Sequence, residues 1–156
     1  MMVENEFISI NIAVVTISDT RELKNDKSGD ILQNKITQFG HNVTVREIVK
    51  DDFNKISDLF KKLLKNKDID VIISTGGTGL TGRDITPEVM DTLFEKTIDG
   101  FGEMFRWLSF KKINTSALQS RALAGVECGK YIFCLPGSPS ACKDGWDEIL
   151  KSVSYT

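Results

Sequence analysis

A glycine-rich segment at residues 76–82 (GGTGLTG) follows a run of apolar residues and is the part of the sequence best suited to binding an anion. Small residues let successive backbone N–H groups converge on one oxyanion, and the neighbouring threonines add hydroxyl donors. A phosphate group fits such a loop. The predicted phosphate- and nucleotide-binding residues are Thr75, Gly76, Gly77, Thr78 and Gly79.

Two known glycine-rich patterns are only partly present in this segment. Residues 77–82 satisfy GxGxxG, but a dinucleotide-binding loop opens directly into a helix and has an acidic residue at a strand end about 20 residues further on. Here the helix is expected near Pro87, and Asp99 lies in a predicted turn. The glycine spacing also matches a Walker A loop, yet Arg83 and Asp84 replace its lysine and hydroxyl residue. Neither pattern is therefore assigned.

Asp84 lies just beyond the glycine-rich segment, next to the expected position of a phosphate. Two negative charges at such a place repel each other unless a divalent cation bridges them. Mg²⁺ prefers one or two carboxylates together with phosphate oxygens. The alternative is that Asp84 caps the turn leading into the next helix, a common role for a loop aspartate. The spacing leaves both interpretations open.

A second acidic pair, Asp51 and Asp52, follows the second predicted strand. The pair lies at the same edge of the sheet as Asp84 if the strands run parallel, so both sites can face one ligand. The alternative is that these aspartates cap the helix beginning at Phe53. One residue of the pair can serve each purpose.

Further polar residues stand in loops at the same predicted edge. Ser18 and Asp19 follow the first strand, and Ser138 follows the last one, where it is more simply an N-cap. Asp26 and Ser28 precede the first helix, and they either start that helix or contribute to an anion site at its N-terminus.

The elements that position these loops alternate between strand and helix patterns. Ser28 and Thr86 are predicted helix caps, Gly40 a helix end, and Gly100 and Gly102 a break before a helix. The order predicts a single domain over residues 1–156, an α/β fold with a mostly parallel, doubly wound sheet and a short β-hairpin or edge strand. Expected strands span 11–18, 43–49, 70–75, 122–126 and 131–135; expected helices span 29–39 and 103–110 or begin at Phe53, Pro87 and Pro139.

Composition limits the classes of function. The chain has 20 Lys and Arg against 22 Asp and Glu, a formal charge of −2, and this balance favours neither nucleic acid nor a membrane surface as partner. Three cysteines without CxxC spacing and a single histidine argue against disulfides and a Cys/His zinc site. No leader pattern or membrane-spanning run is present, so the cytoplasm is the expected compartment.

Nucleophilic catalysis finds no support in the sequence. His41 precedes the second strand, so we expect it at the opposite edge of the sheet and on the surface, away from any Ser or Cys partner. Cys134 and Cys142 are interpreted as core residues. The aromatic residues Phe105, Trp107 and Phe110 are interpreted as core or subunit contacts.

Several segments together resemble the MoaB/MogA family of molybdenum cofactor biosynthesis proteins. The resemblance runs from the first strand to the last helix, and residues 101–125 with the short length are closer to the MoaB branch. The segments that carry it are 18–19 (SD), 26–29 (DKSG), 74–81 (STGGTGLT), 83–88 (RDITPE), 100–103 (GFGE), 120–125 (SRALAG) and 135–139 (LPGSP).

The resemblance implies a three-layer α/β/α sandwich, assembly into trimers or a dimer of trimers, and binding of molybdopterin. It also implies that molybdopterin is adenylylated at its terminal phosphate with Mg²⁺ and ATP and that pyrophosphate is released. The two acidic residues that serve catalysis in the family fall on Asp84 and Asp51, which are the expected catalytic and metal-binding residues. Some members of the MoaB branch have lost one of them, and this chain retains both.

The remaining expected contacts are with the substrate. Arg121 has a guanidinium that matches a phosphate, although a structural ion pair is an equal alternative for it. The expected substrate-binding residues are Ser18, Asp19, Ser28, Ser120, Arg121, Gly137 and Ser138. Two other functions remain open: a carrier or scaffold that binds molybdopterin without turnover, and, with less support, a nucleotide-binding oxidoreductase.

Overall fold

The computed structural model describes residues 6–153. Residues 1–5 and 154–156 of the predicted domain lie outside the described residues. Within residues 6–153 the strands form one sheet in the order β2-β1-β3-β6-β5-β4. Strands β2, β1, β3 and β6 are parallel, and β5 and β4 are antiparallel to their neighbours. The strands are β1 (Asn11–Ile17), β2 (Asn42–Val49), β3 (Val71–Thr75), β4 (Lys96–Thr97), β5 (Leu123–Glu127) and β6 (Lys130–Leu135).

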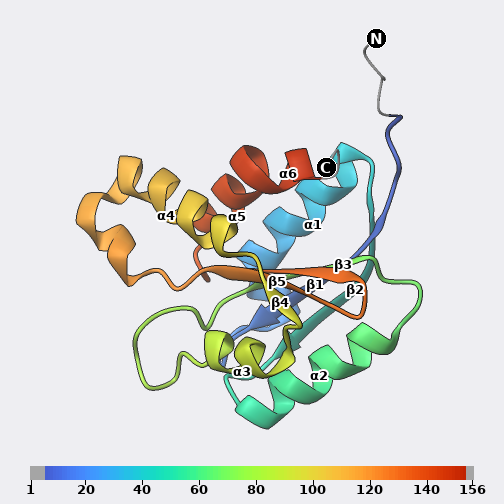
Figure 1. Ribbon diagram of the computed structural model, residues 1–156, viewed down its shortest axis with the longest axis horizontal. Helices are drawn as coiled ribbons and strands as arrows, with labels where there is room; N and C mark the ends of the chain where they lie inside the picture. Colours follow the sequence, from blue (N-terminus) through green and yellow to red (C-terminus); the bar gives the residue numbers. More distant parts are fainter. Residues whose placement is uncertain (1–5, 154–156) are drawn as a thin grey trace.

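Helices cover both faces of the sheet and complete three layers, as expected (Figure 1). Helices α1, α4, α5 and α6 lie on one face, and α2 and α3 lie on the other. The α-helices are α1 (Lys27–Phe39), α2 (Phe53–Lys65), α3 (Thr86–Leu93), α4 (Asp99–Ile113), α5 (Pro139–Gly145) and α6 (Lys151–Val153); shorter turns are η1 (Leu23–Asn25), η2 (Asn114–Gln119) and η3 (Trp146–Leu150).

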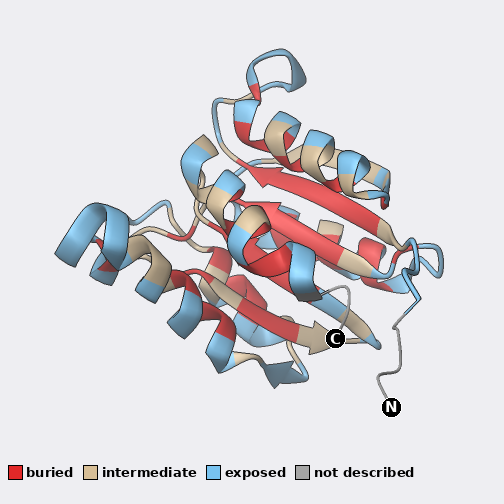
Figure 2. Ribbon diagram, turned by 90° about the horizontal axis from the view of Figure 1, so that it is seen from above, coloured by how far each residue is buried: buried red, intermediate tan, exposed pale blue. Residues whose placement is uncertain are grey.

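Two hydrophobic clusters, one on each face of the sheet, hold the layers together. Ile12 and Val14 of β1 face one cluster, whereas Ala13 and Val15 face the other, so the strand is buried on both sides. Figure 2 shows the central strands as buried ribbons between helices whose outer faces are exposed. Among the described residues, no helix is long and apolar enough to cross a membrane.

Strand β1 is the point at which the strand order of the sheet changes direction. From β1 the chain proceeds to β2 on one side and then crosses to β3 on the other side. In an open parallel sheet, ligands bind beyond the carboxyl ends of the strands at such a switch point. The loops after β1 and β3 are therefore the expected walls of a site, and these loops begin at Ser18 and Gly76.

Two predicted helix caps are wrong. Asp26, not Ser28, caps α1, and its side chain accepts from the Gly29 N–H. Thr86 makes no cap hydrogen bond for α3; its hydroxyl donates to the Gly76 carbonyl oxygen at 3.0 Å. Each of these two hydroxyl groups donates instead to a carbonyl oxygen of another loop. The Ser28 hydroxyl donates to the carbonyl oxygen of Gly137.

The predicted break near residue 100 is also wrong, because α4 begins at Asp99 and runs through Gly100 and Gly102. A Cβ on Gly102 would lie 2.7 Å from the Ala122 carbonyl oxygen, so the missing side chain lets the helix approach the sheet. Packing of Phe101 and Phe105 into the core offsets the cost of about 1 kcal/mol for each helical glycine. Strand β4 was not predicted from the sequence.

The expected hairpin is confirmed and consists of β5 and β6. Cys128 and Gly129 both have positive φ, as a tight two-residue turn requires. The second of these strands does not lie at the sheet edge, because β6 pairs in parallel with β3. Gly40 ends α1 in the left-handed conformation, as predicted. Cys134 and Cys142 are buried, as predicted.

His41 lies just before β2, at the expected edge of the sheet, but the prediction that it is a surface residue is wrong. Its side chain is only 3% exposed and packs among the rings of Phe7, Phe39 and Trp146. Its Nδ1 accepts from the Ile10 N–H at 3.2 Å. Burial disfavours the charged imidazole and lowers the pKa of His41 below 6.5.

His41 is expected to make the stability of the fold depend on pH. Because the folded pKa lies below the unfolded value of 6.5, its contribution is complete above that pH and is lost as the pH falls through the folded pKa. His41 is the only histidine in the chain. We therefore expect the thermal midpoint to fall more steeply between about pH 7.5 and about pH 5.5 in the wild type than in His41→Gln. Parallel curves would contradict this expectation.

Candidate functional site

A pocket of about 520 Å³ lies at the switch point, among the loops that follow β1, β2, β3 and β6. It brings together nine of the predicted site residues: Ser18, Asp51, Gly76, Gly77, Thr78, Gly79, Asp84, Ser120 and Gly137. Asp19, Ser28, Thr75, Arg121 and Ser138 lie outside its lining. A separate pocket of about 410 Å³ opens near His41 at the opposite edge of the sheet, and none of these loops contributes to its lining.

The glycine-rich loop passes so close to its neighbours that side chains are excluded from it. A Cβ on Gly76 would lie 2.1 Å from the Ile17 carbonyl oxygen, and one on Gly77 would lie 2.2 Å from the Thr86 hydroxyl. Both residues have positive φ, 107° and 71°. Glycine at these positions therefore lets the backbone itself form the pocket wall.

Most amides of this loop are available to an anion. The Gly76 N–H donates to the Leu135 carbonyl oxygen at 2.9 Å and is not free to bind a ligand. Within residues 6–153, the N–H groups of Gly77, Thr78 and Gly79 donate to no acceptor. The candidate anion cradle is therefore formed by residues 77–79, whereas the sequence also predicts Thr75 and Gly76 as part of it.

Arg121 stabilises the glycine-rich loop and is not among the residues that line the pocket. Its Nε donates to the Gly79 carbonyl oxygen at 2.7 Å, and its Nη2 donates to the Asp84 carbonyl oxygen at 2.9 Å. Nη1 pairs with Glu88 and lowers the pKa of that carboxyl group. The arrangement favours the structural role for Arg121 over contact with a substrate phosphate.

Asp84 serves the turn and faces the pocket at once, so the two interpretations of this residue are compatible. Its Oδ2 accepts from the Thr81 N–H at 2.9 Å and from the Thr81 hydroxyl at 2.7 Å. The same oxygen would lie 2.6 Å from a Cβ on Gly79, which places the carboxylate against the amide cradle.

Asp51 and Asp52 divide the two roles foreseen for them. Asp52 caps α2 by accepting from the Lys55 N–H at 2.9 Å. Asp51 lines the pocket, and its Oδ1 lies 3.2 Å from where a Cβ on Gly77 would be. Burial, followed by the negative charges of Asp19 and Asp84, raises the pKa of Asp51 above its usual value. The acidic groups are therefore close enough to repel each other.

Asp19 differs from these carboxylates because it already has a cation. Its Oδ2 accepts from the Arg83 Nε at 2.9 Å, and its Oδ1 accepts from the Asp51 N–H at 3.1 Å. The hydrogen bond with Arg83 is the main reason that the pKa of Asp19 is lowered. Asp19 thus orients the loop that carries Asp51. Among the described residues, Asp51 and Asp84 form no ion pair, although the charge of Arg83 partly offsets the rise in the pKa of Asp51.

The residues present fit a magnesium ion that is shared with a phosphate group. Two carboxylates that form no ion pair among the described residues face one pocket, and the negative charge of Asp84 is among the causes that raise the pKa of Asp51. Among the described residues, no group of three or more His, Cys, Asp or Glu side chains is placed to hold a metal ion. Mg²⁺ bound by one or two carboxylates takes its other ligands from water and substrate phosphate oxygens.

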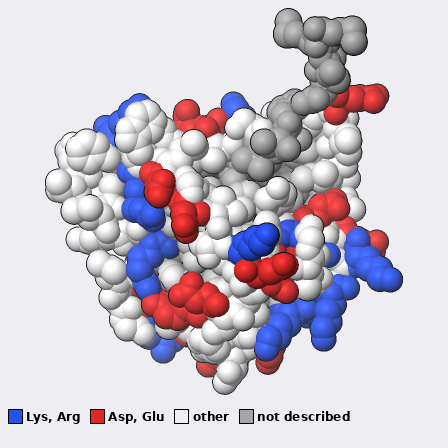
Figure 3. Space-filling model, in the orientation of Figure 1, with Lys and Arg blue, Asp and Glu red and all other residues white. Residues whose placement is uncertain are grey.

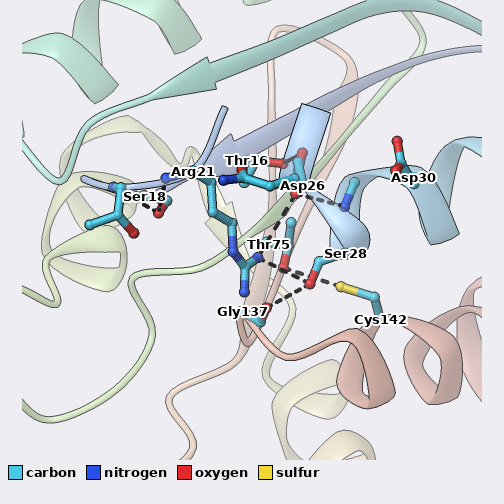
Figure 4. Close-up of polar contacts among 12 residues, drawn as sticks. Thr16, Ser18, Arg21, Asp26, Ser28, Asp30, Thr75, Gly137 and Cys142 are labelled. Carbon is cyan, nitrogen blue, oxygen red and sulfur yellow. Dashed lines mark hydrogen bonds and ion pairs between the residues drawn. The ribbon is translucent and has the colours of Figure 1, made fainter. Parts of the chain in front are cut away.

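A buried network behind the pocket ties the loop after β1 to the loop after β6 (Figure 4). Asp26 is fully buried and accepts from Thr16 at 2.6 Å and from the Arg46 guanidinium at 3.3 Å. Ser28 donates to the Gly137 carbonyl oxygen at 2.7 Å. Asp26 also accepts from the Gly29 N–H and so starts α1, which is one of the two interpretations drawn from the sequence, whereas its contacts with Thr16 and Arg46 could not be predicted from the sequence.

The remaining predicted residues shape the loops around the pocket. The Thr75 hydroxyl donates to the Pro136 carbonyl oxygen at 2.8 Å, and burial raises the pKa of the adjacent Cys142 thiol to about 11. Ser138 caps α5 through the Ala141 N–H, as predicted. The Ser18 hydroxyl accepts from the N–H groups of Thr20 and Arg21.

A family described as "Probable molybdopterin binding domain" (MoCF_biosynth) matches residues 13–154. The chain belongs to this MoaB/MogA family of molybdenum cofactor biosynthesis proteins. It is 43% identical over 148 residues to molybdenum cofactor biosynthesis protein B of Escherichia coli (strain K12), covering 95% of this chain and 87% of that protein. It is 44% identical over 143 residues to the protein of the same name from Halalkalibacterium halodurans, with 91% and 84% covered.

Solved structures of the family have the same fold. A crystal structure of molybdenum cofactor biosynthesis protein B superposes with a TM-score of 0.92 at 38% identity, covering 96% of this chain and 94% of that chain. The tungsten cofactor synthesizing protein MoaB from Pyrococcus furiosus superposes with a TM-score of 0.82 at 34% identity, with 93% and 92% covered. The resemblance inferred from the sequence and the predicted fold class are thereby confirmed.

Proposed function

We propose that this protein binds molybdopterin and adenylylates its terminal phosphate with Mg²⁺ and ATP, releasing pyrophosphate. The observation that carries the proposal is the meeting, in one pocket, of free loop amides at residues 77–79 with two carboxylates, Asp51 and Asp84, that lack a cation. An anion cradle beside two acidic groups suits a ligand that is both phosphorylated and metal-bound. The choice of molybdopterin as that ligand is supported by the family, which is described as a probable molybdopterin binding domain.

In the proposed reaction, an oxygen of the terminal phosphate of molybdopterin attacks the α-phosphorus of ATP. A new P–O bond forms, the bond between the α-phosphorus and the bridging oxygen breaks, and pyrophosphate leaves with that electron pair. Bound Mg²⁺ would neutralise charge that develops on the phosphate oxygens. Asp51 and Asp84 would hold the ion, and the amides of residues 77–79 would orient a phosphate group for in-line attack. No covalent enzyme intermediate is needed.

A pyrophosphate-release assay separates this proposal from a molybdopterin-binding carrier or scaffold. The purified protein is given ATP with and without Mg²⁺ and with and without molybdopterin. Adenylylation requires pyrophosphate release only when all three are present, together with the appearance of an AMP adduct of the pterin. Calorimetric binding of molybdopterin without pyrophosphate release would instead identify a carrier.

The cytoplasm remains the predicted compartment.

The structure gives no support to the oxidoreductase alternative. Helix α3 begins only at Thr86, after a turn that separates it from the glycine-rich loop. Asp99 opens α4 instead of ending a strand, so the position of the ribose-binding acidic residue is not filled.

We further propose that the protein assembles as a trimer or a dimer of trimers through the exposed face of α4 and η2. Met104, Trp107, Phe110 and Ile113 recur at steps of three along α4 and are each more than half exposed, and Leu118 of η2 is 81% exposed. Figure 3 shows a largely uncharged surface at the left, where α4 and η2 lie in Figure 1. Exposed large apolar side chains gathered on two consecutive elements in this way favour a protein interface.

The proposed interface predicts that Trp107→Glu dissociates the oligomer. A carboxylate placed in the middle of an apolar contact loses its hydration when the subunits associate, which disfavours association. Sedimentation velocity or light scattering is expected to give a monomer mass for this variant and an oligomer mass for the wild type. Phe53→Glu, a matched change of an exposed aromatic at the start of α2, is the control and leaves the wild-type mass unchanged. A monomeric wild type would contradict the assembly proposal.

A further inference from the structure

Arg21 is the one positively charged side chain that lines the candidate site within residues 6–153. The other charged residues in the lining are Asp51 and Asp84. Nearby cations are committed elsewhere, since Arg83 pairs with Asp19 and Arg121 holds the loop backbone. A pocket for phosphates that already contains two carboxylates therefore has a single guanidinium of its own.

The backbone and side chain of Arg21 are both held in place. The Arg21 N–H donates to the Ser18 hydroxyl at 3.2 Å, which fixes the turn after β1. Its Nη1 donates to the Ser28 hydroxyl at 3.1 Å, and Ser28 in turn donates to the Gly137 carbonyl oxygen at 2.7 Å. Figure 4 shows the guanidinium directed from the β1 loop toward Ser28 and Gly137. The side chain is therefore directed toward the β6 loop before any ligand binds.

Among the described residues, Arg21 forms an ion pair with Asp26 but no hydrogen bond to a carboxylate. Its closest carboxylate oxygen, Asp26 Oδ1, is 3.9 Å away, beyond hydrogen-bond distance. Asp26 already accepts from Arg46 at 3.3 Å, from Thr16 and from the Gly29 N–H. Asp26 is thus shared between Arg46, which also pairs with Asp30 at 2.7 Å, and Arg21, to which it makes no hydrogen bond. The guanidinium of Arg21 can therefore still form hydrogen bonds with another anion.

Most donors of the guanidinium are also unused. Of its N–H groups, only those on Nη1 have an acceptor among the described residues, and the side chain is 30% exposed. Arginine offers its donors as a planar fork that matches two oxygens of one phosphate. Asp26 and Ser28, which sequence reasoning treated as helix-starting or substrate-binding residues, are then positioning residues for this fork.

We propose that Arg21 binds a phosphate oxyanion of the ligand in this pocket, held for that purpose by Ser28 and Asp26. The proposal rests on the proposed function, because that function brings two phosphorylated ligands to the site. The phosphate belongs either to the pterin or to the nucleotide. Both present the same oxyanion chemistry, and separate binding measurements distinguish them.

The test measures binding without turnover, using molybdopterin alone, ATP alone and inorganic phosphate alone as titrants in calorimetry. Arg21→Gln is expected to weaken binding of at least one of the two phosphorylated ligands by about tenfold to a hundredfold, as for loss of a charge-assisted fork. Arg21→Lys is expected to recover part of the affinity because it restores the charge without the fork. Thermal melting checks that each variant is folded.

Arg83→Gln is the matched control, since it removes the same charge near the pocket from a side chain already paired with Asp19. It is expected to bind all three titrants within about twofold of the wild type. Weakening of molybdopterin binding alone assigns the pterin phosphate to Arg21, and weakening of ATP binding alone assigns a nucleotide phosphate.

Wild-type affinity of Arg21→Gln for all three titrants, or an equal loss in Arg83→Gln, would overturn the proposal. Because no turnover is measured, the result is separate from that of the pyrophosphate assay. A protein that released no pyrophosphate but bound molybdopterin through Arg21 would refute adenylylation and retain this inference. If Arg21→Gln does not fold, the comparison of Arg21→Lys with the wild type decides the matter in the same way.

Discussion

Asp51→Asn is expected to lower the rate of molybdopterin adenylylation by at least about a hundredfold, as for loss of a group that stabilises charge in a transition state. Asparagine keeps the shape of the side chain but loses the negative charge that would hold Mg²⁺. Asp84→Asn is expected to cause a comparable loss, because the two carboxylates face the same pocket. Pyrophosphate release in the presence of Mg²⁺, ATP and molybdopterin measures both effects.

Asp51→Asn is also expected to stabilise the fold at neutral pH. Burial and the charges of Asp19 and Asp84 raise the pKa of Asp51 in the folded state above the unfolded value of 3.8. The folded state therefore binds a proton more tightly, and stability attributable to Asp51 is lost as the pH rises from 3.8 through the folded pKa. Asp51→Asn removes this penalty, so its thermal midpoint should exceed that of the wild type near pH 7.

Asp52→Asn provides the matched control one residue away. Asp52 caps α2 and lies outside the pocket lining, so this variant should retain activity. Asparagine is itself a good N-cap, which keeps the change in unfolding free energy small, whereas Asp52→Ala should cost about 1 kcal/mol. Equal activity of Asp51→Asn and the wild type would remove Asp51 from the mechanism, whatever happens to stability.

Gly76→Ala is expected to destabilise the protein by roughly 2–5 kcal/mol, from backbone strain and overpacking together. The residue has a φ of 107°, and its Cβ would lie 2.1 Å from the Ile17 carbonyl oxygen. That oxygen is a backbone atom at the end of β1 and cannot move aside without disturbing the sheet. Denaturant unfolding measures the loss, which is a large share of a typical stability of about 5–15 kcal/mol.

Gly82→Ala tests the same substitution in the same segment where space is open. No atom lies within 4 Å of the position that its Cβ would take, and its φ is not positive. The change in unfolding free energy should stay within about 0.5 kcal/mol. A result in which Gly82→Ala is as damaging as Gly76→Ala would show that the close contact after β1 is not the cause.

Apart from the two-residue strand β4, the order of strands and helices could be predicted from the sequence, because the apolar residues of the longer elements follow recognisable patterns. Helix α2 has apolar residues at steps of three and four, of which Ile56, Phe60 and Leu63 are buried. Strand β1 is a nearly continuous apolar run, which is typical of a strand covered on both faces. These local patterns were sufficient for the fold class and for the edge at which the loops meet.

Contacts between distant loops could not be read in the same way. Ser28 is a favourable N-cap by type, but its hydroxyl bonds to Gly137, which lies 109 residues away in the sequence. Arg121 looked equally suited to a phosphate and to an ion pair, and only the fold shows that two of its donors bind the carbonyl oxygens of Gly79 and Asp84. Arg21 was not singled out because nothing in its neighbourhood marks it as a pocket residue.

The glycine-rich loop is fastened by Leu135, Thr86 and Arg121, which come from three other parts of the chain. The loss of backbone entropy needed to shape it therefore occurs during folding, before a ligand arrives. Amides that are already aligned need not reorganise when an anion enters, so more of the contact energy remains as affinity. The anion cradle is thus a preorganised receptor, and no lid closure is required to assemble it.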